Sequence, residues 1–133
     1  MLNIIFDICI KTLEKGKQVL VFVHSRKDTY LTAKELSKKI DEFPKYEKLF
    51  ISDNAKQMQN HVLRSKNEHL KEIYKYGMGM HHAGMLRTDR SLMENCFKKG
   101  CIKVLFCTST LAWGVNLPAY AVIINGTEYY DPE

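Results

Sequence analysis

Apolar residues along this chain fall into two patterns, short continuous runs and longer stripes with a spacing of three or four residues. The runs are typical of strands buried on both faces, and they occupy residues 19–23, 77–82, 102–107 and 121–125. The stripes are typical of amphipathic helices that cover a sheet. Strands that alternate with helices predict an α/β fold, with a parallel sheet and helices on both of its faces.

The first stripe opens the chain and predicts a helix whose buried positions are Leu2, Phe6, Cys9 and Leu13. This helix is expected to end near Gly16, because glycine readily adopts the left-handed conformation that closes a helix. Asp7 interrupts the apolar stretch and no basic segment precedes it, unlike a secretory leader. We therefore expect a core helix, no signal peptide and no membrane-spanning segment.

A second helix is predicted after the strand at 19–23, with a buried face formed by Ala33, Leu36, Ile40 and Phe43. Ser25 or Asp28 can cap the start of this helix, and Pro44 is expected to end it. Residues 45–75 are polar, and their imperfect stripe consists of Met58, Val62, Leu70 and Ile73. One amphipathic helix with an irregular approach is expected in that stretch.

A third helix is predicted to begin near Thr88 or Asp89 and to end at Gly100. Its expected buried positions are Leu92, Met93, Cys96 and Phe97. An acid in its first turn and lysines in its last turn complement the helix dipole. The helix thus has consistent signals at both ends.

The length of the chain indicates one domain-sized core, and its composition gives an excess of positive charge. The 133 residues are enough for one core and too few for two typical domains. A net charge of +5 favours a polyanionic partner, although exposed lysines also keep ordinary domains soluble. Charge alone leaves both interpretations open.

Cysteine and histidine spacing predicts no metal site. The cysteines lack a Cys-x-x-Cys spacing, and they are Cys9, Cys96, Cys101 and Cys107. Three of them lie in apolar patterns, where a thiol acts as a small hydrophobic group, so a reducing, intracellular compartment is expected. His81 and His82 are adjacent on a predicted strand and point to opposite faces, so packing or hydrogen bonding is expected of them.

Three strand ends carry groups suited to phosphate. The run at 19–23 leads into Ser25 and Arg26, the run at 77–82 leads toward Gly84, and the run at 102–107 leads into Thr108. Hydroxyls, guanidinium groups and free backbone N–H groups all bind phosphate oxygens. Because the carboxyl ends of parallel strands lie at one edge, these residues are expected at a common edge of the sheet.

The strings VLVFVHSRK, HHAGMLRTDR and TSTLAWGVNLPA, in this order, closely resemble motifs IV, IVa and V of the Ski-like DExH group of superfamily-two helicases. The resemblance extends from about Gln18 to Gly126, and it is strongest to the large tandem-cassette RNA helicases of the spliceosome and of the activating-signal cointegrator. It implies that residues 1–133 form part of the second RecA-like motor domain of a helicase. The implied fold is a RecA-like parallel sheet with helices on both faces.

The resemblance also implies roles for individual residues. Contacts to the backbone of a single strand are implied for Ser25, Arg26, Gly84, Arg87 and Thr108. Contacts to the nucleotide across the cleft between the two motor domains are implied for Gly114, Val115 and Asn116. Asn116 stands where related helicases have an aspartate facing the ribose, and Trp113 stands where DEAD-box proteins have an arginine, whose role therefore cannot be transferred.

Taken by themselves, the residue types are also compatible with purely structural roles at the same positions. Ser25 is as well suited to capping a helix as to binding phosphate, and it can do both. Arg26 and Arg87 are also compatible with ordinary solvated side chains, and Trp113 with a core position. The order of the three motifs favours the functional interpretation of all of them together.

Other helicase motifs do not occur in the sequence. It has no Gly-x-x-x-x-Gly-Lys-Ser/Thr loop and no magnesium-binding DExH string, and it ends before the arginine-finger motif of the family. We therefore expect no catalytic residue in this fragment, no tightly bound cofactor and no ATP hydrolysis by the fragment alone. ATP and Mg²⁺ are expected to bind in the full-length enzyme, together with an N-terminal RecA domain.

Two functional classes remain open at this point. The first is the C-terminal motor half of an ATP-dependent 3′-to-5′ RNA helicase, with a DNA-repair helicase of the same group as a variant. The second is a non-catalytic RecA-like module that binds RNA or a protein. The implied partners are single-stranded nucleic acid, preferably RNA, and a large ribonucleoprotein or multiprotein complex, in the nucleus and without a membrane.

Overall fold

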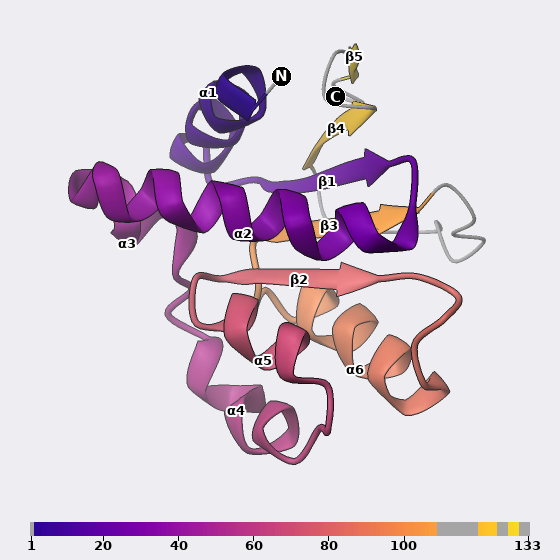
Figure 1. Ribbon diagram of the computed structural model, residues 1–133. Helices are drawn as coiled ribbons and strands as arrows, with labels where there is room; N and C mark the ends of the chain where they lie inside the picture. The colour runs from indigo at the N-terminus through magenta and orange to yellow at the C-terminus, as the bar shows by residue number, and fades with distance from the viewer. Residues whose placement is uncertain (1, 109–119, 125–127, 131–133) are drawn as a thin grey trace.

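A five-stranded sheet organises the computed structural model, which describes residues 2–108, 120–124 and 128–130 (Figure 1). The strands are β1 (Gln18–Val23), β2 (Met78–His81), β3 (Val104–Thr108), β4 (Tyr120–Ile124) and β5 (Glu128–Tyr130), in the spatial order β2-β3-β1-β4-β5. The first four in this row are parallel to one another, and β5 pairs antiparallel with β4. The predicted parallel α/β sheet is confirmed, and β5 is an addition that the sequence patterns did not predict.

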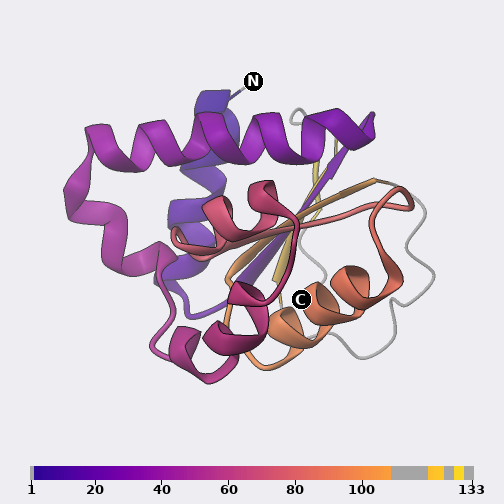
Figure 2. The ribbon, with the colours of Figure 1, turned by 60° about the horizontal axis from the view of Figure 1, so that its bottom comes forward.

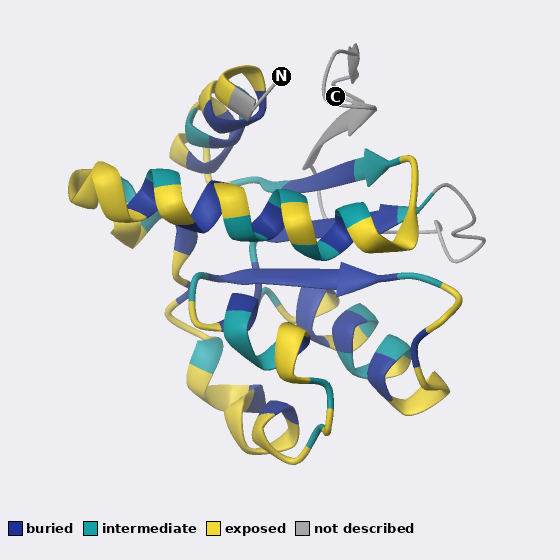
Figure 3. Ribbon diagram, viewed as in Figure 1, coloured by how far each residue is buried: buried dark blue, intermediate teal, exposed yellow. Residues whose placement is uncertain are grey.

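Helices precede β1 and fill the intervals between β1 and β2 and between β2 and β3. They are α1 (Leu2–Glu14), α2 (Arg26–Glu42), the 3₁₀ turn η1 (Pro44–Tyr46), α3 (Glu47–Phe50), α4 (Ala55–Leu63), α5 (Glu68–Tyr74) and α6 (Arg87–Lys98). Their inner faces form one apolar core with β1, β2 and β3, while their outer faces are exposed (Figure 3). In the part of the chain that the structure describes, no helix is long and apolar enough to cross a membrane.

Helices α2 and α6 lie on opposite faces of the sheet (Figure 2). The connection from β1 to β2 passes over β3 in one direction, and the connection from β2 to β3 steps back in the other. Connections between parallel strands are right-handed, so steps in opposite directions place their helices on opposite faces. The opposite directions of the two connections thus explain why α2 and α6 cover different faces of the sheet.

Helices α1 and α2 begin and end as the sequence predicts, with one exception. The expected inward residues Phe6, Cys9 and Leu13 are buried, and Gly16 follows α1 with φ 79°. The exception is Phe43, which is 38% exposed although it continues the buried stripe of α2. The helix ends one residue earlier, and Phe43 leaves the helical conformation with φ −124° and ψ 74°. The side chain of Leu2 lies outside the described residues.

The stretch at 45–75 differs from the predicted single helix. It consists of η1, α3, α4 and α5, separated by turns. The buried stripe is nevertheless correct, since Met58, Val62, Leu70 and Ile73 are all buried. The chain breaks after α4 because Ser65 and Asn67 make local side-chain bonds: Ser65 Oγ accepts from the Asn67 N–H at 3.0 Å, and Asn67 caps α5.

Helix α6 is close to its prediction. It begins at Arg87, one residue before Thr88, and Gly100 follows it with φ 74°. Met93, Cys96 and Phe97 are buried as expected, whereas Leu92 is only half-buried because it faces a hollow beside α4.

The side chain of Gln18 joins three elements at the amino end of β1. Its Nε2 donates to the carbonyl oxygens of Phe97, in α6, and of Ile102, just before β3, each at 2.8 Å. The Phe97 carbonyl is one of those at the end of a helix that have no partner within the helix. One amide side chain therefore fixes the end of α6 and the start of β3 to the central strand.

All four cysteines are buried free thiols. Burial raises the pKa of Cys96 to about 12, and it raises the pKa values of the other three as well. They therefore pack as small apolar groups, as the sequence predicts.

Candidate nucleic-acid interface

The carboxyl ends of β1, β2 and β3 meet at one edge of the sheet, as the strand arrows show (Figure 1). Val23 at the end of β1 pairs with Thr108 at the end of β3, and His81 at the end of β2 pairs with Cys107. The segments that follow these strands therefore begin side by side. We call this region, with Ser25, Arg26, His82, Gly84 and Thr108, the carboxyl edge.

Ser25 is the N-cap of α2. Its hydroxyl oxygen accepts a hydrogen bond from the Asp28 N–H at 3.2 Å, and its backbone is extended, with φ −137° and ψ 160°. The residue is exposed, and its hydroxyl hydrogen is a donor in addition to the accepting oxygen. Capping and donation to a phosphate are compatible at this position.

Arg26 packs against Gly84, although β3 separates the strands that carry them. A β-carbon built at Gly84 would lie 3.0 Å from Nη1 and 3.3 Å from Cδ of Arg26. Both residues are exposed. The absence of a side chain at position 84 thus leaves the space that the guanidinium group occupies, and it brings the first two strand-end motifs into contact.

His82 completes this contact, and the sequence analysis did not assign it to the interface. The Gly84 N–H donates to Nδ1 of His82 at 3.1 Å, which requires that nitrogen to be unprotonated. Partial burial lowers the pKa of His82, and the positive charge of Arg26 and the proximity of His81 lower it further. Its position two residues before Gly84 was the available signal, but the approach of Arg26 depends on the folded chain.

His81 does not take part in the contact between Arg26, His82 and Gly84, and its side chain faces α6 instead. It is buried, and its Nε2 lies 2.7 Å from Oε2 of Glu94 in α6. This pair links the end of β2 to α6, as expected for a packed or hydrogen-bonded histidine. Within residues 2–108, 120–124 and 128–130, no cluster of three or more potential metal ligands is found.

Thr108 is half-buried at the end of β3, beside Val23 and therefore close to the start of the Ser25 segment. The residues expected to reach the nucleotide are Gly114, Val115 and Asn116, and they lie outside the described residues.

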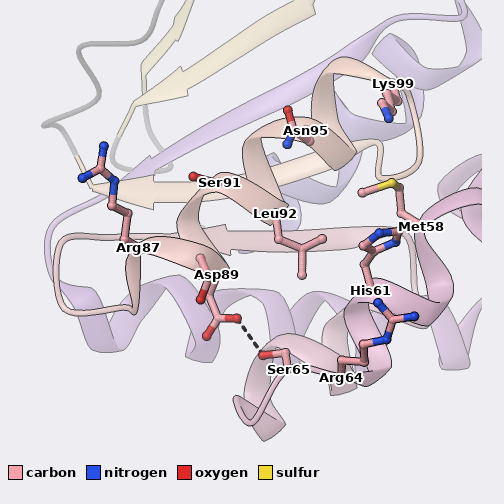
Figure 4. Close-up of a pocket in the computed structure, with 11 residues that line it drawn as sticks. Met58, His61, Arg64, Ser65, Arg87, Asp89, Ser91, Leu92, Asn95 and Lys99 are labelled. Carbon is pink, nitrogen blue, oxygen red and sulfur yellow. Dashed lines mark hydrogen bonds between the residues drawn. The ribbon is translucent and has the colours of Figure 1, made fainter.

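Arg87 is separate from the Arg26 group. It is the first residue of α6, is exposed, and lines two hollows along that helix, one of about 710 Å³ and one of about 380 Å³. In Figure 4 its side chain extends away from the bond between Ser65 and Asp89. The structure thus brings Ser25, Arg26, Gly84 and Thr108 to the carboxyl edge and places Arg87 at its border with α6.

The side chains at the carboxyl edge include groups that can bind phosphate. Ser25 offers a hydroxyl and Arg26 offers a guanidinium group, and both groups bind phosphate whatever base it carries. The Gly84 N–H is bonded to His82 in this structure, so a ligand must compete with the imidazole for it.

Comparison with known proteins gives a family for this arrangement. A family model described as "Helicase conserved C-terminal domain" matches residues 2–133, nearly the whole chain. The match includes the carboxyl edge and the residues beyond Thr108.

Several curated proteins are similar to the chain over most of its length. The DExH-box ATP-dependent RNA helicase DExH14 of Arabidopsis thaliana is 46% identical over 94% of this chain. Activating signal cointegrator 1 complex subunit 3 of Danio rerio is 46% identical over 98%, and the RQC trigger complex helicase SLH1 of Saccharomyces cerevisiae is 45% identical over 97%. The chain spans only 6%, 9% and 7% of these three proteins, respectively.

Proposed function

This chain belongs to the helicase conserved C-terminal domain family, and on that premise we propose that it is the C-terminal motor half of an ATP-dependent 3′-to-5′ RNA helicase. In this proposal residues 1–133 are part of the second RecA-like domain of a longer parent protein. The domain holds the single strand by its backbone while an N-terminal RecA domain closes against it. The names of two relatives, an ATP-dependent RNA helicase and a trigger complex helicase, support the activity.

The observation that carries the proposal is the contact between Arg26 and Gly84 at the common edge of β1, β2 and β3. It joins two segments that are far apart in sequence and that both carry phosphate-binding groups. We assign contacts to the RNA backbone to Ser25, Arg26, Gly84, Arg87 and Thr108. Sequence-independent movement along a strand requires such contacts, because phosphates are identical under every base.

The ATP cleft needs both halves of the motor. We assign nucleotide contacts to Gly114, Val115 and Asn116, which follow the Thr108 strand end in sequence. The phosphate-binding loop lysine and the Mg²⁺-binding carboxylates must come from the other half, because the sequence of this chain contains neither motif. ATP and Mg²⁺ thus act in the parent protein.

We also propose that the parent protein works in a multiprotein complex. The names of two relatives, a cointegrator complex subunit and a trigger complex helicase, support this. A ribonucleoprotein such as the spliceosome and a nuclear location rest on the motif resemblance described above. The name of the Arabidopsis thaliana relative, an RNA helicase, favours RNA over DNA, since backbone contacts alone do not read the 2′-hydroxyl.

The test uses the parent protein with Arg26→Ala and, as a control, Lys11→Ala on the exposed face of α1. We expect Arg26→Ala to weaken single-strand RNA binding equally for all sequences and to reduce the slope of log affinity against log salt by about 0.7. RNA-stimulated ATP turnover should fall with it, whereas Lys11→Ala should leave both unchanged. A parent protein that binds RNA without any RNA-stimulated turnover would support the non-catalytic module instead. A preference for DNA in the same assays would support the DNA-repair variant.

A further inference from the structure

A hollow lies between α4 and α6, on the side of α6 that faces away from the sheet (Figure 4). We call it the α4–α6 groove. Its volume is about 710 Å³, within the range of pockets that hold ligand groups. His61, Arg64 and Ser65 line it on one side, and Arg87, Leu92 and Lys99 line it on the other.

The charge of the groove is strongly positive. Arg64, Arg87 and Lys99 are exposed permanent cations, and none of them takes part in the ion pairs found among the described residues. The acid in the lining is Asp89, which is buried and accepts a hydrogen bond from the Ser65 hydroxyl at 2.8 Å. Its charge is therefore held inside the wall, and the cations face the open side. Such a surface is complementary to an acidic partner.

The groove also has apolar lining residues. Met58 and Leu92 line it between the charged residues, and a methionine adapts to irregular partner surfaces. Apolar side chains beside exposed cations indicate a surface that binds apolar and acidic side chains together.

The same features argue against a nucleic acid as the occupant. The described lining contains no phenylalanine, tyrosine or tryptophan, and its only aromatic ring is the imidazole of His61, so bases would find few side chains on which to stack. A nucleic-acid backbone, in turn, gains nothing from the apolar side chains of Met58 and Leu92. The groove also lies along α4 and α6, and of the residues assigned to RNA it shares only Arg87.

We propose that the α4–α6 groove docks an acidic, amphipathic segment of a protein partner, with leucine-type side chains on Met58 and Leu92 and carboxylates on Arg64 and Lys99. A helix with apolar residues at positions i, i+3 or i+4, and i+7 fits a groove of this composition. The groove would thus serve recruitment, a role distinct from gripping RNA at the carboxyl edge.

The experiment measures binding of a fluorescent peptide of about 20 residues to the parent protein. The probe peptide is rich in glutamate and carries leucines on one helical face, and the control peptide has the same composition with the leucines dispersed. We expect Arg64→Glu combined with Lys99→Glu to weaken probe binding at least about tenfold, while the equal charge change Lys11→Glu with Lys38→Glu changes it less than about twofold.

Four results would overturn the proposal. They are equal binding of both peptides, equal losses in the groove and control variants, an absence of probe binding, and a loss of RNA affinity in the groove variant as large as that in Arg26→Ala. The last result would make the groove a nucleic-acid surface. The parent protein with Asn95→Cys gives a further check, because slow maleimide labelling at this exposed position would show that another part of the same chain covers the groove. Retention of RNA-stimulated ATP turnover in the groove variants separates this proposal from the proposed motor function.

Discussion

The guanidinium group of Arg26 occupies the space that a side chain at Gly84 would fill, with Nη1 3.0 Å from the position of that missing β-carbon. The two residues follow different strands, β1 and β2, and belong to different sequence motifs. Their contact joins the two motifs into one surface, so a substitution at either residue should change the position of the other.

We predict that Gly84→Ala weakens RNA binding of the parent protein mainly by moving Arg26. The new methyl group would meet the flexible end of Arg26 and Nδ1 of His82, which can shift, so the melting temperature should change little. Arg26→Ala should cost about 1.5–3 kcal/mol of RNA binding, the range for a hydrogen bond to a charged group. In the double variant, Gly84→Ala should add little, because the residue it displaces is absent. Fluorescence anisotropy on all three variants measures this, and fully additive losses would show that the two positions act independently.

His82 should make the folded domain less stable in acid. Burial and the neighbouring Arg26 and His81 lower its pKa below the ordinary value of 6.5, so the folded state disfavours its protonation. The unfolded chain then binds more protons as the pH falls below about 6.5, and stability declines there, whereas above that value His82 contributes no penalty. We predict that His82→Gln flattens the dependence of melting temperature on pH between about pH 5 and pH 7. Parallel curves for the two proteins would exclude His82 as the cause.

Gly77 and Gly16 offer a matched test of backbone strain against steric overlap. Both have positive φ, 78° and 79°, but a β-carbon at Gly77 would lie 1.8 Å from the carbonyl oxygen of Phe50, whereas at Gly16 it would meet nothing within 4 Å. We expect Gly16→Ala to cost about 1–2 kcal/mol of unfolding free energy from strain alone. Gly77→Ala should cost more than about 4 kcal/mol or prevent folding, because the backbone itself must move. Urea denaturation measures both, and similar midpoints would mean that α3 shifts freely.

Thr108 and Asn116 should affect different steps in the parent protein. Thr108→Ala is expected to lose RNA affinity first, through one missing phosphate bond of about 1.5–3 kcal/mol. Asn116→Ala should instead reduce RNA-stimulated ATP turnover and unwinding more than RNA affinity, if its contact forms only when the two motor halves close. Gly114→Val should be the most damaging, because a β-branched side chain obstructs close backbone approach. Equal losses in every assay, with a lower melting temperature, would assign these residues a purely structural role.

The polypeptide of 133 residues should not hydrolyse ATP by itself. It contains no phosphate-binding loop lysine and no magnesium-binding carboxylate motif, and phosphoryl transfer depends on both. Phosphate release with and without single-stranded RNA, in a repurified sample, is the measurement. Turnover that copurifies with this polypeptide would contradict the division of the ATP cleft between two halves.

The sequence predicted the elements whose signals are local. The strand at 19–23, the glycines that end α1 and α6, and the Ser25 cap all depend on residues within a few positions of one another. The division of 45–75 into several helices was missed because its turns depend on bonds to distant partners as well as on the local bonds of Ser65 and Asn67: Ser65 donates to Asp89, and Ser52 donates to the Gly100 carbonyl. The inclusion of His82 in the interface was missed for the same reason, since Arg26 reaches it across β3.

The side chain of Gln18 has a consequence for where the domain can open. By donating to the carbonyls of Phe97 and Ile102, it joins the amino end of β1 to α6 and β3, whereas at the carboxyl edge β1 and β2 are followed by exposed residues. Amide hydrogens near residues 18–20 and 101–105 should therefore exchange with solvent only through global unfolding, and those at 82–86 through small local fluctuations. The domain can thus reshape the edge that meets a ligand, at a low free-energy cost, while its opposite edge keeps the strands in register.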